Sequence, residues 1–194
     1  MKSINENWLK DDIKNKCKIE ELKGIKNIIE CSEVYKSVFN GPPFYEDWNL
    51  ESSMEVINSY IKDKAIVLSF KYEKEIVGFL VAINRVPIEQ QIYVEYLEQI
   101  KYIEEIGVLN SYRNKRIASE LVRILLLNYL NKEDKYICYR TNAMRYFELS
   151  DKESFESSVI RIQKEDKIKR LNNEKIVIPE FNNSEKQKFI NMYI

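Results

Sequence analysis

The chain has 194 residues with 31 Lys plus Arg and 31 Asp plus Glu, so no global field attracts it to nucleic acid or to an acidic membrane surface. It contains no His, which removes the commonest zinc ligand and general base, and we predict no metal site. Three widely spaced Cys, a polar N-terminus and no apolar run of membrane-spanning length predict a cytoplasmic protein without a disulfide framework.

The beginning of the chain predicts an appendage followed by a helix. Residues 1–20 show no firm hydrophobic period, and we interpret them as an N-terminal appendage to a single domain over 21–194. Apolar residues then recur at intervals of three and four over 25–39, which is typical of an amphipathic helix. The segment Asn40-Gly41-Pro42-Pro43 should end this helix.

Further helices and strands alternate along the rest of the chain. A second helix should run from Asn49 or Glu51 to Lys62, and a hairpin should follow around the turn Glu73-Lys74-Glu75. The hairpin strands are 65–72 and 76–84. Downstream we predict a short helix or long loop after Pro87, a strand over 102–109, a helix over 116–131, a strand over 136–141, a short helix over 143–149, strands over 155–163 and 175–178, and a terminal helix over 185–192. The strand 136–141 should be parallel to 102–109, since a helix crosses between them.

The stretch 102–121 is the most informative, because it predicts a strand, a tight polar turn and a helix start. The first backbone N–H groups of a helix have no intrahelical acceptor and lie at its positive dipole end. Such an end binds phosphate readily. Arg113, Lys115 and Arg116 add cationic side chains around these amides.

This stretch resembles the acetyl-CoA motif of the GNAT N-acetyltransferases, in which a strand ending in Val is followed by Tyr-Arg/Gln-x-x-Gly-x-Gly/Ala at a helix start. Val108, Tyr112, Arg113, Ile117 and Ala118 fall in register, whereas Arg116 replaces the first glycine. A bulky residue there could narrow the site, or its guanidinium could contact a phosphate.

The resemblance implies an α/β fold, namely the GNAT fold with a central mixed, mostly antiparallel sheet flanked by helices. Two parallel strands are splayed apart in that family, where acetyl-CoA binds as cosubstrate. The cofactor-binding residues that it implies are Ile106, Gly107, Val108, Arg113, Asn114, Lys115, Arg116, Ile117, Ala118 and Asn142.

Two adjacent glutamates are the candidate general bases or amine anchors. The run Glu-Glu-Ile-Gly-Val and the following Ser-Tyr-Arg look most like the spermidine/spermine-type enzymes, which carry an acceptor-facing glutamate at the position of Glu104. Because side chains alternate along a strand, Glu104 and Glu105 should lie on opposite faces of the sheet. Glu104 is preferred because it matches the acceptor-facing glutamate. Glu105 is second, because a bulge in the strand would exchange the two faces. The alternative is that both form ordinary ion pairs at the rim.

A tyrosine and an aromatic loop complete the predicted site. By resemblance, Tyr146 is the candidate proton donor, although the spacing around it departs from the family pattern and a Tyr packed on the sheet explains it equally well. The family also carries a Phe, Pro-Pro and acidic-Trp run beside its acceptor site, which implies that Phe44, Tyr45, Glu46 and Trp48 bind substrate. The alternative is a loop that only covers the core.

The predicted function is acetyl-CoA-dependent N-acetyl transfer to a primary amine of a small or peptidyl, cationic acceptor. One alternative is a catalytically impaired GNAT-like domain that binds CoA or a protein. Another is an acyltransferase acting on a larger partner, such as a protein N-terminus. Basic residues including Arg123 are interspersed with acidic ones, so we interpret them as a solvated face and not as a nucleic-acid site. The sequence leaves a homodimer open.

Overall fold

The computed structural model describes Leu9 and residues 16–42, 44–84, 100–130, 136–142 and 187–193, with the backbone alone for Ile100 and the last two stretches. The predictions for 87–97, 143–149, 155–163 and 175–178, and for Tyr146, lie outside these residues. The chain forms two compact units, Met1–Ala82 with Glu105–Tyr129, and Ile83–Glu104 with Leu130–Ile194. The assignment of 21–194 to a single domain stays a prediction.

Two helices of the first unit lie where the hydrophobic period predicted them. Helix α1 spans Ile25–Asn40 and ends at the Gly-Pro segment. Helix α2 spans Leu50–Lys62 and begins with a capping box, in which the Asn49 side chain accepts from Ser52 N at 2.9 Å. The Ser52 hydroxyl in turn accepts from Asn49 N at 3.2 Å. These two bonds fix the helix start by satisfying amides that precede the intrahelical ladder.

The sheet of the first unit has the strand order β1-β2-β3-β4. Strands β2 (Ile66–Tyr72) and β3 (Glu75–Ile83) form the predicted antiparallel hairpin. Strand β4 spans Ile100–Val108 and follows β3 in the sheet.

The sequence did not predict β1 (Cys17–Glu21), which pairs antiparallel with β2. The end of the expected appendage therefore belongs to the sheet. Lys71 of β2 supports this pairing, because its Nζ lies 2.7 Å from Glu20 Oε1. The Lys18 and Lys71 ammonium groups hold the pKa of Glu20 below its usual value.

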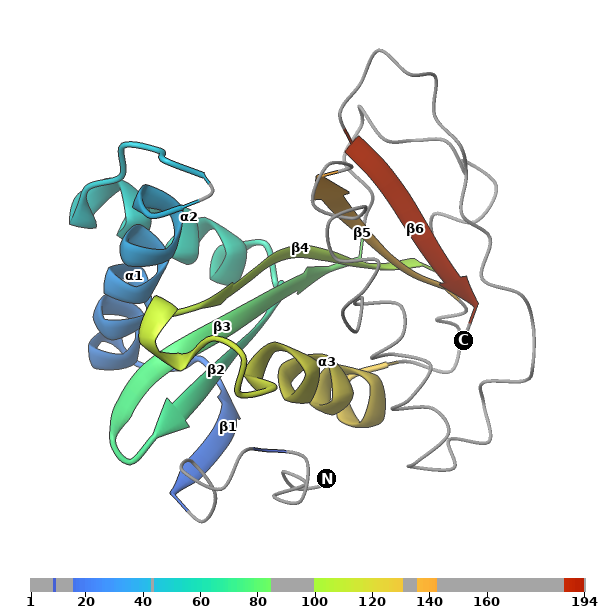
Figure 1. Ribbon diagram of the computed structural model, residues 1–194, viewed down its shortest axis with the longest axis horizontal. Coiled ribbons are helices and arrows are strands. Elements are labelled where there is room, and N and C mark those ends of the chain that lie inside the picture. The colour runs from blue at the N-terminus through green and yellow to red at the C-terminus, as the bar shows by residue number, and fades with distance from the viewer. Residues whose placement is uncertain are drawn as a thin grey trace. The chain divides into compact units, whose positions relative to one another are not determined.

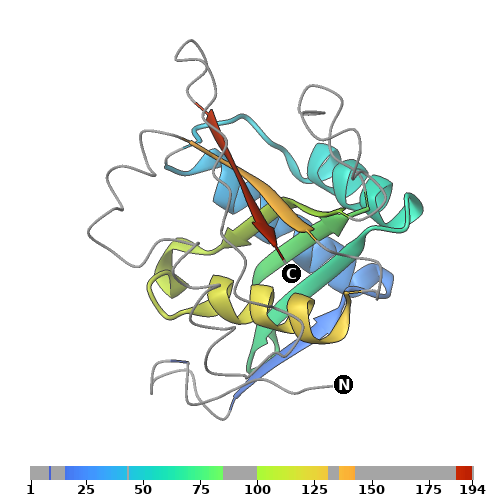
Figure 2. The ribbon, with the colours of Figure 1, turned by 90° about the vertical axis from the view of Figure 1, so that its right-hand side faces the viewer.

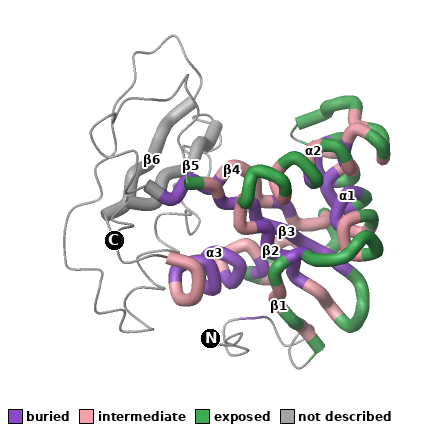
Figure 3. The backbone as a smooth tube through the Cα atoms, turned by 180° about the vertical axis from the view of Figure 1, so that it is seen from behind, coloured by how far each residue is buried: buried purple, intermediate pink, exposed green. Residues whose placement is uncertain are grey.

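Helices cover both faces of this sheet (Figures 1 and 2). On one face, Tyr35 of α1 stacks on Phe79 of β3 with ring centroids 5.6 Å apart. On the other face lies α3, which spans Ile117–Asn128. Two glycines permit the close packing: a Cβ on Gly107 would lie 2.5 Å from the Phe79 ring, and one on Gly78 would lie 3.2 Å from Ile117 Cγ2. Buried chain runs through β2, β3 and α3 (Figure 3).

Helix α3 also contains a buried ion pair. Arg123 donates from Nε and Nη2 to the two carboxylate oxygens of Glu120 at 2.8 and 2.7 Å. Glu120 is 0% exposed and Arg123 is 2% exposed, so the interpretation of Arg123 as part of a solvated face is wrong. The two hydrogen bonds of this pair compensate both charged groups for the hydration that they lose on burial.

The second unit contains the start of β4 together with β5 (Tyr136–Asn142) and β6 (Gln187–Tyr193), in the order β4-β5-β6. Strand β5 is parallel to β4, as predicted, and the two pair over Ile100–Ile103 and Tyr136–Tyr139. The predicted terminal helix over 185–192 is wrong, because β6 pairs antiparallel with β5 along its whole length. Backbone hydrogen bonds to a neighbouring strand outweigh the weak helical period of so short a segment.

None of the helices in the described part of the chain combines the length and apolar character that crossing a bilayer requires.

We predict that Gly107→Ala lowers the free energy of unfolding by about 1–3 kcal/mol, because the new methyl group overpacks the buried Phe79 ring. Gly41→Ala is the matched control: φ at Gly41 is −87°, and an added Cβ would have its nearest neighbour at 3.2 Å. Urea unfolding followed by circular dichroism measures both variants. Equal losses would contradict a specific clash at position 107.

Candidate active site

The turn between β4 and α3 is held in a strained backbone conformation. Leu109 N donates to Val77 O of β3 at 2.9 Å, and a short 3₁₀ helix, η4 (Asn110–Tyr112), follows. Asn114 and Arg116 then adopt left-handed conformations, with φ of 62° and 66°. Asn tolerates this conformation, whereas a long side chain such as Arg does so at a cost. Position 116, where the acetyl-CoA motif has its first glycine, therefore has the left-handed backbone conformation typical of glycine, although the residue is Arg116.

Arg116 is the N-cap of α3 and lies outside the helix, so the predicted helix start at 116 is one residue early. Its left-handed backbone excludes the helical geometry expected there. No side chain caps the helix, and the first intrahelical bond runs from Glu120 N to Arg116 O at 3.0 Å. The amides of Ile117 and Ala118 precede this ladder, at the positive end of the dipole. Such an amide cluster fits a phosphate group.

The Arg113 side chain contacts the protein's own backbone. Its Nε donates to Val108 O at the end of β4 at 3.2 Å, and its Nη1 donates to Pro42 O at 3.1 Å. Two of its five N–H donors therefore join the turn between β4 and α3 to the connection between α1 and α2. The sequence predicted a phosphate-binding role for Arg113 but contained no signal for these carbonyl contacts.

The predicted acceptor loop is closed by its own hydrogen bonds. The Asn40 side-chain amide accepts from Trp48 N and donates to Trp48 O, both at 2.8 Å. Trp48 Nε1 donates to Glu46 Oε2 at 2.5 Å, which orients this carboxylate. The Trp48 ring meets Tyr35 edge-on at 5.1 Å, and Phe44 packs on Phe39 at 4.9 Å.

Much of the same loop is exposed (Figure 3). Phe44 is 43% exposed, and Tyr45, with φ of 53°, is 74% exposed. The loop therefore covers the core in part, as one interpretation had it, while its substrate-binding role stays a prediction. Trp48 covers the core, while Phe44, Tyr45 and Glu46 face outward.

The faces of β4 distinguish the two candidate carboxylates. A Cβ on Gly107 would meet Phe79 and Val38, which place that face of β4 against α1. Residues two apart share a face, so Glu105 lies on the α1 face and Glu104 on the opposite one. Both side chains are half-buried, and Glu104 Oε2 is shielded from solvent. Glu105 therefore lies on the side of the sheet that carries α1, and Glu104 lies on the other side, while the catalytic role of each stays a prediction.

The remaining predicted cofactor residues are distributed along the strand and helix ends. Ile106 and Val108 are half-buried in β4, Asn114 is exposed, and Ile117 is buried at 2% exposure. Lys115 Nζ lies 6.0 Å from the centre of the Tyr112 ring. Asn142 is the last residue of β5.

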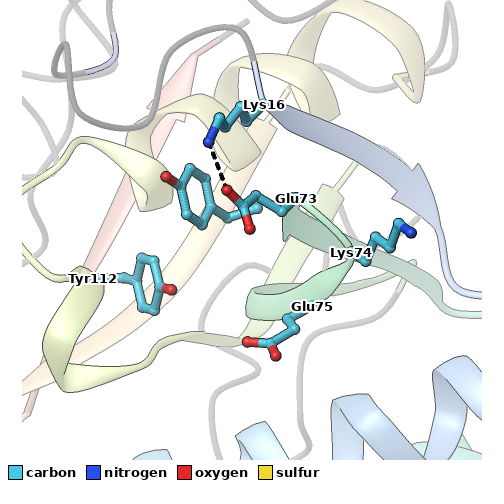
Figure 4. Close-up of a pocket in the computed structure, with 6 residues that line it drawn as sticks. Lys16, Glu73, Lys74, Glu75 and Tyr112 are labelled. Atoms are coloured by element: carbon cyan, nitrogen blue, oxygen red, sulfur yellow. Dashed lines mark hydrogen bonds and ion pairs between the residues drawn. The ribbon is translucent and has the colours of Figure 1, made fainter.

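A separate open pocket of about 690 Å³ lies beside the turn (Figure 4). Its lining comes from the start of the sheet, the β2–β3 turn and η4, namely Lys16, Tyr72, Glu73, Lys74, Glu75 and Tyr112. Lys16 Nζ and Glu73 Oε1 form an ion pair at 2.7 Å across it. Among the described residues, none of those predicted for catalysis or acceptor binding lines this pocket.

Two chemical alternatives receive no support from the described residues. Burial raises the pKa of the Cys31 thiol to about 12, so it is not a nucleophile at neutral pH. Over the stretches that the structure describes, no three Cys, Asp or Glu side chains gather as a metal site would require.

Residues 33–149, more than half of the chain, match the model of the acetyltransferase (GNAT) family. This chain belongs to the GNAT acetyltransferase family. It is therefore an acetyltransferase that uses acetyl-CoA for N-acetylation, and the amides at the start of α3 fit the phosphates of that cosubstrate.

Solved structures support the GNAT fold. A protein from Pyrococcus horikoshii OT3 has a TM-score of 0.58 at 18% identity, covering 92% of this chain and 98% of that one. The diaminobutyrate acetyltransferase of Paenibacillus lautus, in complex with L-2,4-diaminobutyric acid and coenzyme A, has a TM-score of 0.57 at 11% identity, covering 91% and 94%. The ribosomal-protein-alanine N-acetyltransferase of Brucella melitensis has a TM-score of 0.59 at 11% identity, covering 91% and 99%. No curated protein sequence matches the chain significantly.

We predict that Arg116→Gly stabilises this GNAT domain by up to about 1.6 kcal/mol, with about 0.8 kcal/mol as the central value. Glycine adopts the left-handed backbone conformation without strain, which adds about 1–2 kcal/mol to the free energy of unfolding. The greater freedom of glycine in the unfolded chain subtracts about 0.4–1 kcal/mol from it. Arg116→Ala is the control, because it deletes the guanidinium but keeps the strained Cβ. Urea unfolding of both variants checks this, and an equal gain in Arg116→Ala would assign the effect to the side chain instead.

Proposed function

We propose that the acceptor is a small cationic primary amine of the polyamine type. The observation that carries this proposal is the Glu46 carboxylate, which is oriented by the Trp48 indole N–H and lies in the same loop as the exposed rings of Phe44 and Tyr45. A carboxylate next to aromatic faces attracts an ammonium group through ion pairing and cation–π contact. The name of the Paenibacillus relative, a diaminobutyrate acetyltransferase, is consistent with a diamine.

We further propose that Glu105 anchors the reacting amine or removes its proton. Acetyl transfer needs the amine lone pair, so a positioned carboxylate that accepts the proton, directly or through water, promotes attack on the thioester carbonyl. Glu105 shares the face of β4 that packs on α1, the helix that leads into the acceptor loop. Glu104 lies on the opposite face, which makes it the weaker candidate. Tyr146 stays the proposed donor to the leaving thiolate.

The turn geometry favours an active enzyme over an impaired binding module. The main reason to suspect impairment was Arg116 in the glycine position. Because Arg116 adopts the left-handed conformation that glycine would adopt, the amides after it keep their phosphate-binding orientation. The substitution therefore costs stability without removing the backbone donors.

We expect Glu105→Gln to lower kcat of acetyl transfer by about 10²–10⁴-fold, the usual contribution of a general acid or base. Acetyl-CoA affinity should stay nearly unchanged, because this carboxylate does not contact the phosphates. Glu104→Gln is the matched control and should lose far less. The measurement is steady-state release of CoA, with calorimetry for acetyl-CoA. Loss confined to Glu104→Gln would return the role to that residue.

The acceptor class is tested by a panel of amines at fixed acetyl-CoA. Spermidine and 1,4-diaminobutane should give kcat/KM at least tenfold above that of glutamate, because only the polyamines keep a second ammonium group for Glu46 while the first amine reacts, whereas glutamate adds carboxylates that Glu46 repels. Glu46→Gln should raise KM for spermidine without changing kcat. A peptide with an N-terminal alanine as the best substrate would contradict the polyamine assignment and favour a protein acceptor.

A further inference from the structure

We propose that Arg113 is a positioning residue that couples cofactor binding to the order of the acceptor loop, here residues 40–42 and 44–48. The acceptor role of this loop comes from the proposed function, but the coupling itself depends only on contacts within the first unit. The guanidinium bonds Val108 O at the end of β4 and Pro42 O in the loop. One side chain thus fixes the spacing of two backbone segments, one 5 residues and the other 71 residues from Arg113 in sequence.

The guanidinium is suited to this task by its rigidity. Its donors lie in one plane at fixed angles, so two carbonyls are held in a defined relation. A lysine has one ammonium nitrogen on a flexible stem, so its N–H groups cannot hold two carbonyls at a fixed spacing. Hydrogen bonds from a charged donor are also stronger than those between neutral groups.

On the cofactor side, Arg113 is an integral part of the turn. Its backbone N donates to Asn110 O at 3.2 Å, and Tyr112 N donates to Leu109 O at 2.8 Å. Asn114 and Arg116 follow in their left-handed conformations. A phosphate bound to the amides after Arg116 would select this turn geometry and so fix the starting point of the Arg113 side chain.

On the acceptor side, the loop transmits the restraint from Pro42 to Trp48. Glu46 N donates to Phe39 O at 3.0 Å, and Phe44 N donates to Gly41 O at 3.1 Å. Asn40 closes the loop on Trp48. Because these bonds make the loop one compact piece, release at Pro42 should loosen Trp48. By linkage, a cofactor that orders the loop should improve acceptor binding, and the acceptor should improve cofactor binding equally.

The test uses Trp48 as a reporter and needs no acceptor. The sequence has two tryptophans, so Trp8→Phe leaves Trp48 as the sole one. In this parent, acrylamide quenching of Trp48 is measured with and without CoA, and calorimetry gives the CoA dissociation constant. The same measurements are made on Arg113→Gln and on Lys115→Gln, a control that loses the same charge in the same turn. Arg113→Lys keeps the charge and serves as a second variant if Arg113→Gln does not fold.

We expect CoA to lower the quenching constant of the parent. Arg113→Gln should raise that constant at least twofold and abolish its response to CoA, with less than a threefold change in CoA affinity. Arg113→Lys should give an intermediate constant. Lys115→Gln should keep the parent's response while weakening CoA binding.

Two results would overturn the proposal. One is an unchanged Trp48 response in Arg113→Gln with CoA affinity reduced tenfold or more, which would make Arg113 a phosphate ligand. The other is a parent whose Trp48 does not respond to CoA. Failure of the amine panel leaves this experiment intact, so an incorrect acceptor is distinguished from an incorrect coupling.

Discussion

The close approach of β3 and β4 between two helix layers is the constraint on which the rest of the first unit depends. Gly107 leaves room for the Phe79 ring against Val38, and Gly78 leaves room for Ile117 at the start of α3. Protein interiors are packed so densely that even one methyl group there would have to displace backbone or rings. The absence of side chains at Gly78 and Gly107 therefore determines how close to the sheet α3 begins, and with it the position of the phosphate-binding amides.

Local patterns in the sequence were sufficient for most of the first unit. The three-four period predicted α1, the breaker at Gly41 ended it, and the second helix predicted to end at Lys62 is α2. The hairpin strands and the parallel direction of β5 also agree with the structure. In each case the deciding interaction is between residues near in sequence, or follows from a general rule of chain connection.

The predictions that failed depend on distant partners. The pairing of β1 with β2 and of β6 with β5 is decided by a strand elsewhere in the chain, which outweighs local propensity. Arg123 resembles a surface charge until Glu120 forms its bidentate partner inside α3. Arg113 carried the expected family signature, but its contact with Pro42 exists only because the fold brings the α1–α2 connection to the end of β4.

The Glu120–Arg123 pair limits how α3 can change over evolution. Loss of one member leaves an uncompensated buried charge, which costs about 3–5 kcal/mol, whereas joint replacement by apolar residues of similar volume is often neutral. Most domains have a total stability of only about 5–15 kcal/mol. The charged and the apolar versions of this helix are therefore separated by a poorly folded intermediate sequence, and positions 120 and 123 should covary in related chains.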